Sequence, residues 1–103
     1  LALAHAIANG LTILPECRAM HGEAVAFGLV VQLRLERAPE LEQVLEFCQR
    51  VGLPTTLEEL GLGEISDADL QGVANAVFRN ERNMANEQAK VTKQKLVQLM
   101  REA

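Results

Sequence analysis

The sequence is organised around one almost wholly apolar stretch, Gly22 to Glu36, which reads GEAVAFGLVVQLRLE. Placed on a helix, its large apolar residues point in every direction: Val25, Phe27, Leu29, Val30, Val31, Leu33 and Leu35. A helix that is hydrophobic all round is normally a buried one. We therefore expect this segment to form the central helix of the domain, with His21 at its N-terminus.

The only two histidines of the chain, His5 and His21, lie upstream of this stretch and at its start. Three of their four direct neighbours are Ala or Gly, which leave room for another group to approach an imidazole. The two residues are sixteen positions apart, so they meet only if tertiary packing brings their helices together. Two histidines from separate elements are a plausible pair of metal ligands, although a zinc site needs at least three protein groups.

The segment before the central helix reads as a helix over residues 1 to 9, which Asn9-Gly10 is expected to close because glycine readily takes a left-handed conformation. A loop containing Pro15 should follow, from Leu11 to Met20. No Ser, Thr, Asp or Asn precedes Leu1, so we expect the first amide groups to lack a side-chain acceptor. The chain also begins without Met. We infer a fragment of a longer polypeptide, with a truncated gene as the alternative.

Helices are also predicted downstream of the central one. A third follows Ala38-Pro39 and ends at Gly52-Leu53-Pro54. Its apolar residues recur at spacings of three and four and form one stripe: Leu41, Val44, Leu45, Cys48 and Val51. After it, Thr56 is expected to cap one short turn over Leu57 to Leu60.

The last two helices have capping residues at their predicted starts. Ser66 to Asp69 resembles a capping box and precedes an apolar stripe formed by Leu70, Val73, Ala74, Val77 and Phe78. Asn80 to Lys90 is polar and without periodicity, which predicts a loop. Thr92 then caps a terminal helix whose inward residues are Leu96, Val97, Leu99 and Met100. The fold class is therefore all-α, a helical bundle of five main helices and a short sixth, with no alternating strand pattern.

Length and composition favour one compact domain over residues 1–103. Ten basic residues against fourteen acidic ones give a net charge of −4, with no basic block that would follow a phosphate backbone, so nucleic acid is not an expected partner. No apolar run reaches transmembrane length, and no membrane partner is expected. No export signal precedes Leu1, so we expect a cytoplasmic chain in which Cys17 and Cys48 are free thiols.

Three motifs occur in order: His5-Ala-Ile-Ala-Asn-Gly-Leu-Thr, then His21-Gly-Glu-Ala-Val-Ala-Phe-Gly, then Val51-Gly-Leu-Pro-Thr-Thr-Leu. Over roughly residues 1 to 80, the chain resembles the C-terminal helical domain of the glycerol dehydrogenase family. This family is the polyol branch of the iron-type alcohol dehydrogenases and is related to dehydroquinate synthase. Ala8 departs from the family pattern, where many members have another histidine, and the loop before His21 is somewhat shorter.

The resemblance implies a metal-dependent oxidation of a polyol such as glycerol, with NAD as the hydride acceptor. In the family a catalytic zinc, or alternatively iron, is held by one Asp and two His, and the two His correspond to His5 and His21. The Asp lies upstream and has no counterpart here, and NAD is held mainly by an N-terminal α/β domain that this sequence also lacks. We therefore expect the isolated chain to be inactive, and we expect homo-oligomers because docking surface would be left exposed.

Other interpretations remain open from the residues alone. His5 could be a core histidine bonded to a carbonyl, and His21 a neighbour of a helix cap. For Glu16 we favour a solvated loop carboxylate and for Glu23 a stabilising role at a helix N-terminus, over metal ligation. Cys17 reads as a small hydrophobe.

Gly22 and Gly28 are expected to permit close packing rather than to bind phosphate. Two alternatives to a dehydrogenase domain are a non-catalytic helical module that self-associates and a lyase of the dehydroquinate synthase type.

Overall fold

The computed structural model describes residues 2–15, 17–80 and 92–103, and over these residues the regular secondary structure is all α-helix, joined by turns and loops. The helices are α1 (Ala2–Thr12), α2 (His21–Glu36), α3 (Leu41–Val51), α4 (Asp67–Asn80) and α6 (Lys93–Glu102). No strand occurs within the described ranges. The predicted all-α class is confirmed, as are five of the predicted helices.

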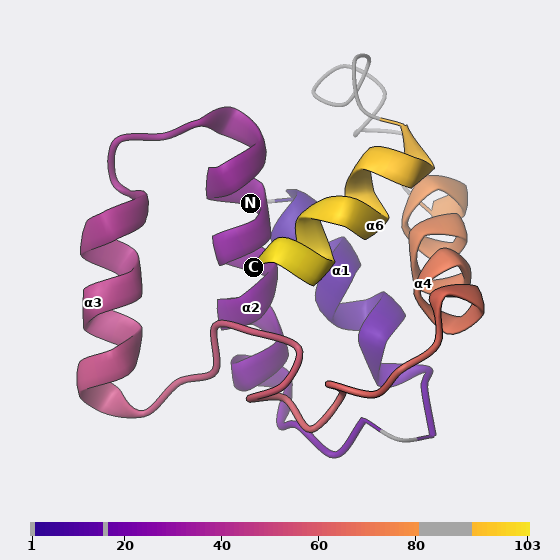
Figure 1. Cartoon of the computed structure of the whole chain (residues 1–103), viewed down its shortest axis with the longest axis horizontal. Helices are drawn as coiled ribbons and strands as arrows, with labels where there is room; N and C mark the ends of the chain where they lie inside the picture. The colour runs from indigo at the N-terminus through magenta and orange to yellow at the C-terminus, as the bar shows by residue number, and fades with distance from the viewer. Residues whose placement is uncertain (1, 16, 81–91) are drawn as a thin grey trace.

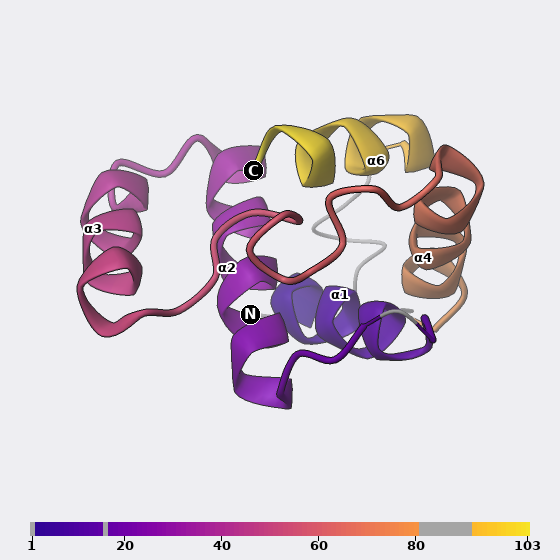
Figure 2. The ribbon, with the colours of Figure 1, turned by 60° about the horizontal axis from the view of Figure 1, so that its bottom comes forward.

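Helix α2 stands in the middle of the molecule, with α3 on one side and α1 on the other (Figure 1). Helix α1 packs against both α2 and α4, while α6 packs against α4 and α2. Turning the molecule shows that α1 and α6 lie at different levels, and that the long connection from α3 to α4 passes from the α2 side to the α4 side (Figure 2). The central position predicted for the apolar helix is therefore confirmed.

The hydrophobic core lies where α1, α2, α4 and α6 meet the 57–65 segment. Its larger members are buried apolar side chains from all five of these segments: Leu3, Ile7, Leu11, Phe27, Val31, Leu57, Leu60, Leu62, Ile65, Leu70, Val73, Val77, Leu96, Leu99 and Met100. The apolar stripes predicted for α4 and α6 face this core, although Phe78 and Val97 are only partly buried. Burial of such stripes, rather than intrinsic helix propensity, supplies most of the stability of helices of this length.

Helix α1 does not end at Asn9-Gly10 as predicted but continues to Thr12. Gly10 lies inside the helix, where it faces α4. A Cβ built on Gly10 would lie 3.0 Å from Cγ1 of Val73 and 3.4 Å from the Val73 carbonyl oxygen. The glycine therefore allows two helices to approach closely, and the prediction of a left-handed cap was wrong because a tertiary contact explains the residue better.

Helix α3 lies at the edge of the molecule and packs mainly against α2. It ends at Gly52, as the sequence predicted, and the φ of 81° at this glycine lies in the left-handed region. Of the predicted apolar stripe, Cys48 is fully buried, whereas Val51 is 52% exposed. Phe47, on the same helix, is 57% exposed. One side of α3 therefore presents apolar surface to solvent.

The predicted caps form. The Thr56 hydroxyl accepts the amide of Glu59 at 3.1 Å, Ser66 accepts that of Asp69 at 3.1 Å, and Thr92 accepts that of Lys95 at 3.0 Å. The loop predicted for residues 80–90 lies almost wholly outside the described residues, and Asn80 belongs to α4. Within the described part of the chain, no helix is both long enough and apolar enough to cross a membrane.

Candidate metal centre

The fold brings the two histidines together. His5 is in the first half of α1, and His21 is the first residue of α2. Their ring centroids are 6.4 Å apart and the ring planes are inclined by 46°. Both side chains are exposed, so a solute can reach them. His5 and His21 are sixteen positions apart in the sequence. Tertiary packing of α1 on α2 therefore places their two imidazoles side by side.

The distance between the rings is close to what a shared metal ion requires. A tetrahedral ion with metal–nitrogen bonds of about 2.0–2.1 Å would hold two imidazole centroids about 5 Å apart. The observed 6.4 Å is slightly longer. Rotation of two exposed side chains about χ1 and χ2 covers such a difference without moving the backbone. The pair therefore fits as two ligands of one ion, on geometry as well as on donor type.

The residues that the structure describes do not supply a third protein ligand beside the two histidines. Among the described residues, no group of three or more His, Cys, Asp and Glu side chains is placed to hold a metal ion. An ion at His5 and His21 would therefore need a further protein ligand from outside the described residues, since catalytic zinc sites use three.

The other residues considered from the sequence have different roles. Glu23 Oε1 accepts the backbone amide of Met20 at 2.8 Å, which is the helix-stabilising role that we favoured for this carboxylate. Cys17 and Cys48 are free thiols, as expected. Cys17 is half-buried against the core. Glu16 lies outside the described residues. Gly28 packs tightly against α1, as expected, whereas a Cβ on Gly22 would meet nothing within 4 Å.

Sequence reasoning missed Gln32, a buried amide on α2 that is 7% exposed. Its Oε1 accepts the backbone amide of Ala4 at 3.2 Å, next to His5 in the chain. The expectation that the first amides of α1 lack a side-chain acceptor was therefore wrong for Ala4, because the acceptor comes from another helix. A lone amide within an otherwise apolar helix was the signal that could have identified it.

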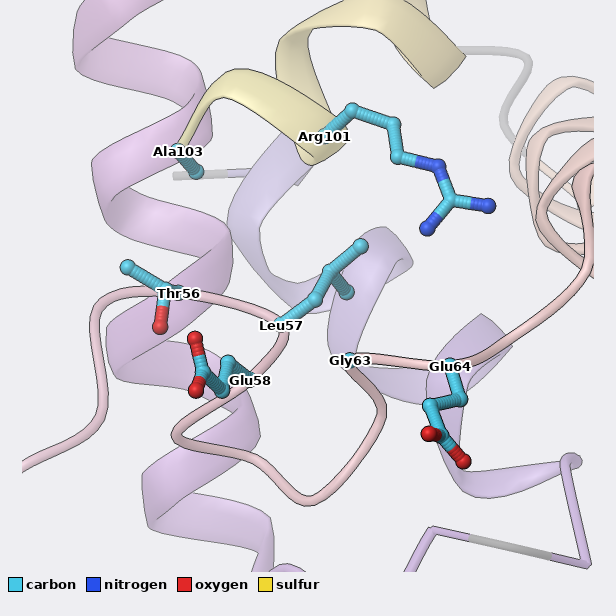
Figure 3. Close-up of a pocket in the computed structure, with 7 residues that line it drawn as sticks. All are labelled: Thr56, Leu57, Glu58, Gly63, Glu64, Arg101 and Ala103. Carbon is cyan, nitrogen blue, oxygen red and sulfur yellow. The ribbon is translucent and has the colours of Figure 1, made fainter.

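One open pocket lies away from the histidines. It has a volume of about 620 Å³ and is open to solvent between the 56–64 segment and the end of α6 (Figure 3). Arg101 lines it, but its guanidinium is already bonded to the Ile65 carbonyl oxygen and to Asp67. Figure 3 shows the carboxylates of Glu58 and Glu64 on separate parts of the rim rather than converging. This pocket therefore has no cluster of groups that could carry chemistry.

Comparison with known proteins supports the resemblance. The chain is 48% identical to glycerol dehydrogenase of Citrobacter freundii in a match of 95 residues that covers 89% of this chain and 26% of that enzyme. It is 46% identical to glycerol dehydrogenase of Thermotoga maritima over 95 residues, again 89% of this chain and 26% of the relative. The chain thus spans about a quarter of the length of these relatives. No protein-family model matches it.

The fold agrees with a solved structure of the same kind of enzyme. The crystal structure of glycerol dehydrogenase from Schizosaccharomyces pombe matches with a TM-score of 0.84 and 38% sequence identity. The match covers 97% of this chain and 26% of the yeast chain. In both sequence and fold, the chain is therefore similar to the helical C-terminal domain of glycerol dehydrogenases, as its three motifs predicted.

Proposed function

We propose that this chain is the metal-binding helical domain of an NAD-dependent polyol dehydrogenase that oxidises glycerol to dihydroxyacetone. The observation that supports it most directly is the convergence of His5 and His21 from two helices, with their rings 6.4 Å apart. The similarity to glycerol dehydrogenases supports the substrate class. In this proposal, a soluble cytoplasmic homo-oligomer carries the complete site.

In the proposed site, His5 and His21 hold zinc, with iron as the alternative metal. A third ligand, an Asp, and an NAD-binding α/β domain would come from outside these 103 residues. The bound ion would lower the pKa of a substrate hydroxyl, which makes transfer of a hydride from the same carbon to NAD easier. The chain's own part is to present two imidazole nitrogens from fixed helices. Alone, it should bind zinc weakly and be inactive.

A chimera tests the proposal with activity. The chain replaces the matching 95 residues of the Citrobacter freundii enzyme, to which it is 48% identical. We expect NAD-dependent glycerol oxidation that a chelator abolishes and zinc restores. His5→Ala and His21→Ala should each remove bound metal and activity, whereas Gln98→Ala on the exposed face of α6 should not. A folded chimera that oxidises no polyol in the presence of zinc or iron would contradict the proposal.

The isolated chain gives a second test without any enzyme. Zinc binding is measured by calorimetry at neutral pH for the parent chain and for the His5→Ala/His21→Ala double variant. We expect weak binding by the parent and none by the double variant. Equal binding by both proteins would place the metal elsewhere and contradict the assignment of these two residues.

A non-catalytic helical module that self-associates is the second candidate. The apolar surface of α3 favours it, because Phe47 and Val51 lie four residues apart and are each more than half exposed. Apolar surface of this kind is often covered by a partner. In sedimentation velocity, this alternative requires that the chain forms a dimer or larger species, and that Phe47→Glu converts it to a monomer. It also requires that the chimera shows no activity.

A further inference from the structure

Gln32 connects the central helix to the backbone of α1. Its Oε1 accepts the amide of Ala4 at 3.2 Å, and its Nε2 donates to Oε2 of Glu36 at 3.2 Å. The side chain is 7% exposed, so both ends of the amide are used within a nearly dry environment. A buried amide hydrogen-bonded at both ends has one orientation available to it. Gln32 therefore holds the Ala4 amide at a fixed place beside α2.

Gly28 lies one turn before Gln32 on α2. It packs against the carbonyl group of Ala4, the residue whose amide is bonded to Gln32. A Cβ built on Gly28 would collide with the carbonyl oxygen of Ala4 and lie 3.0 Å from its Cα. Only a glycine allows the backbones of α1 and α2 to come this close. The two residues of α2 therefore contact the two ends of one residue of α1, its amide and its carbonyl.

This contact determines where His5 lies relative to His21. His5 follows Ala4 directly, so its Cα moves with the Ala4 backbone. His21 is the first residue of α2, seven residues before Gly28 and about 10 Å away along the helix axis. Both histidines are thus placed relative to the same rigid helix. Rotation of the two exposed side chains compensates a small shift, but metal–nitrogen bonds tolerate deviations of only about 0.2 Å. A displacement of α1 beyond the reach of this rotation therefore separates the imidazoles as a pair of ligands.

We propose that Gln32 and Gly28 are positioning residues for the metal pair, which hold His5 at chelating distance from His21 by fixing the Ala4 backbone on α2. The proposal rests on the assignment of His5 and His21 as metal ligands. It concerns a separate step, however: how two exposed side chains on different helices are kept close enough to share one ion.

Copper(II) is the probe, because it binds imidazole more tightly than zinc does and two nitrogens suffice for detection. Electron paramagnetic resonance counts the nitrogens bound to the ion in the 103-residue chain. We expect two for the parent and one for His5→Ala. Gln32→Met keeps the size and removes the acceptor, and should give one nitrogen and a copper affinity lower by about 10- to 100-fold, the usual effect of losing an outer-shell contact. Gly28→Ala should act in the same direction.

The chain offers matched controls for both substitutions. Gln98 donates to Glu102 four residues later at 2.9 Å, which repeats the Gln32–Glu36 pair on an exposed surface without a bond to another helix. Gln98→Met should therefore leave the two-nitrogen signal unchanged. Gly72 lies in α4, and a Cβ there would meet nothing within 4 Å, so Gly72→Ala should also have no effect.

A rescue variant separates positioning from general damage to the fold. Gln32→Glu combined with Glu36→Gln exchanges the two side chains but keeps an acceptor for Ala4 and a donor beside it. We expect this double variant to restore the two-nitrogen signal that Gln32→Met loses. Circular dichroism checks that each variant is helical. If Gln32→Met does not fold, Glu36→Ala is used in its place. This substitution is at an exposed position and removes the acceptor of the Gln32 Nε2 group. We expect it to give a mixture of one- and two-nitrogen spectra.

The outcomes are distinguishable. The positioning role would be overturned, and the metal pair left intact, if the parent, Gln32→Met and Gly28→Ala all fold and all bind copper through two nitrogens. Where Gln32→Met does not fold, an unchanged two-nitrogen signal in Glu36→Ala would overturn it in the same way. One nitrogen in the parent would mean that His5 and His21 do not chelate together, which overturns both the positioning role and the metal assignment. Two nitrogens in the parent, one in Gln32→Met and two in the exchanged variant would support the proposal.

Discussion

The guanidinium of Arg101 donates from Nη2 to the backbone carbonyl oxygen of Ile65 at 2.6 Å, across 36 positions of sequence. The same nitrogen lies 2.9 Å from Oδ1 of Asp67, the first residue of α4. Ile65 itself is buried in the core. One side chain near the end of α6 therefore connects that helix to the segment that precedes α4, and it does so through a backbone group that has little access to water.

Replacing this arginine should lower the stability of the domain. Arg101→Met keeps the aliphatic stem but removes the charged donor to the Ile65 carbonyl. A hydrogen bond with a charged partner contributes about 1.5–3 kcal/mol, so we expect the free energy of unfolding in urea to fall by about 2 kcal/mol. Arg101→Lys should recover only part of this, because an ammonium lacks the planar fork of donors.

Asp67→Asn is the control for the ion pair alone. The Asp67 side chain is 87% exposed, and an exposed pair of this kind contributes about 0–1 kcal/mol. If Asp67→Asn costs as much as Arg101→Met, the bond to the Ile65 carbonyl is not the important one.

Gly10→Ala should destabilise the contact between α1 and α4, although alanine is the better helix former. A Cβ would lie 3.0 Å from Cγ1 of Val73, which is tighter than ordinary van der Waals contact. Overpacking of this kind costs about 1–3 kcal/mol, whereas alanine gains at most about 1 kcal/mol in helix propensity. We expect a lower thermal midpoint. Gly72→Ala, in open space on α4, should leave the midpoint unchanged or raise it.

A double-mutant cycle locates the strain. Val73→Ala removes the methyl groups that the new Cβ would meet, so Gly10→Ala should cost less in the Val73→Ala background than in the parent. Additive effects would show that the two positions do not interact and that another cause lowers the stability.

The sequence predicted the helices well because their signals are local. The all-round apolar stretch identified α2 and its central place, and Thr56, Ser66 and Thr92 were each recognised as caps that the structure contains. Such patterns need only the residues of one segment, because hydrophobic periodicity and capping act within a few positions. The same locality explains why the stripe of α4 was correctly assigned to the core.

The incorrect predictions concern residues whose role depends on a contact with a residue far away in the sequence. Gly10 was read as a helix end but serves close packing on Val73, and the acceptor for the Ala4 amide is Gln32, 28 positions later. The local pattern can show that a residue is unusual, as the amide of Gln32 is in an apolar stretch, but it does not show which distant residue that side chain contacts. The pairing of His5 with His21 could be expected only from the family resemblance, because nothing in the spacing fixes how α1 crosses α2.

Glu23 should matter for stability but not for metal binding. Its carboxylate accepts the amide of Met20 at 2.8 Å at the start of α2, although it is only two residues from His21. Glu23→Ala should lower the free energy of unfolding by about 1 kcal/mol, the usual cost of losing a cap. Zinc affinity measured by calorimetry should stay within about two-fold of the parent, less than the loss expected for a ligand. A larger loss would make Glu23 part of the metal centre.

The buried thiol of Cys48 should make the domain less stable at alkaline pH. Burial, with a further contribution from the negative charge of Glu59, raises the pKa of Cys48 above its ordinary value of 9.0. Above pH 9 the unfolded chain therefore releases this proton while the folded chain keeps it. Stability contributed by the neutral thiol is complete below pH 9 and is lost as the pH rises toward the folded pKa, by at most about 1.4 kcal/mol per pH unit.

The measurement is the free energy of unfolding in urea at several pH values from 8 to 10.5. The difference between the parent and Cys48→Ala isolates the thiol, because every other side chain is the same in both proteins. Cys48→Ala creates a small cavity and should be less stable at pH 8, but its disadvantage should shrink as the pH rises because only the parent carries the alkaline penalty. Cys17→Ala retains the buried thiol and should follow the parent. A parallel pH dependence for the parent and Cys48→Ala would show that Cys48 does not stay protonated in the fold.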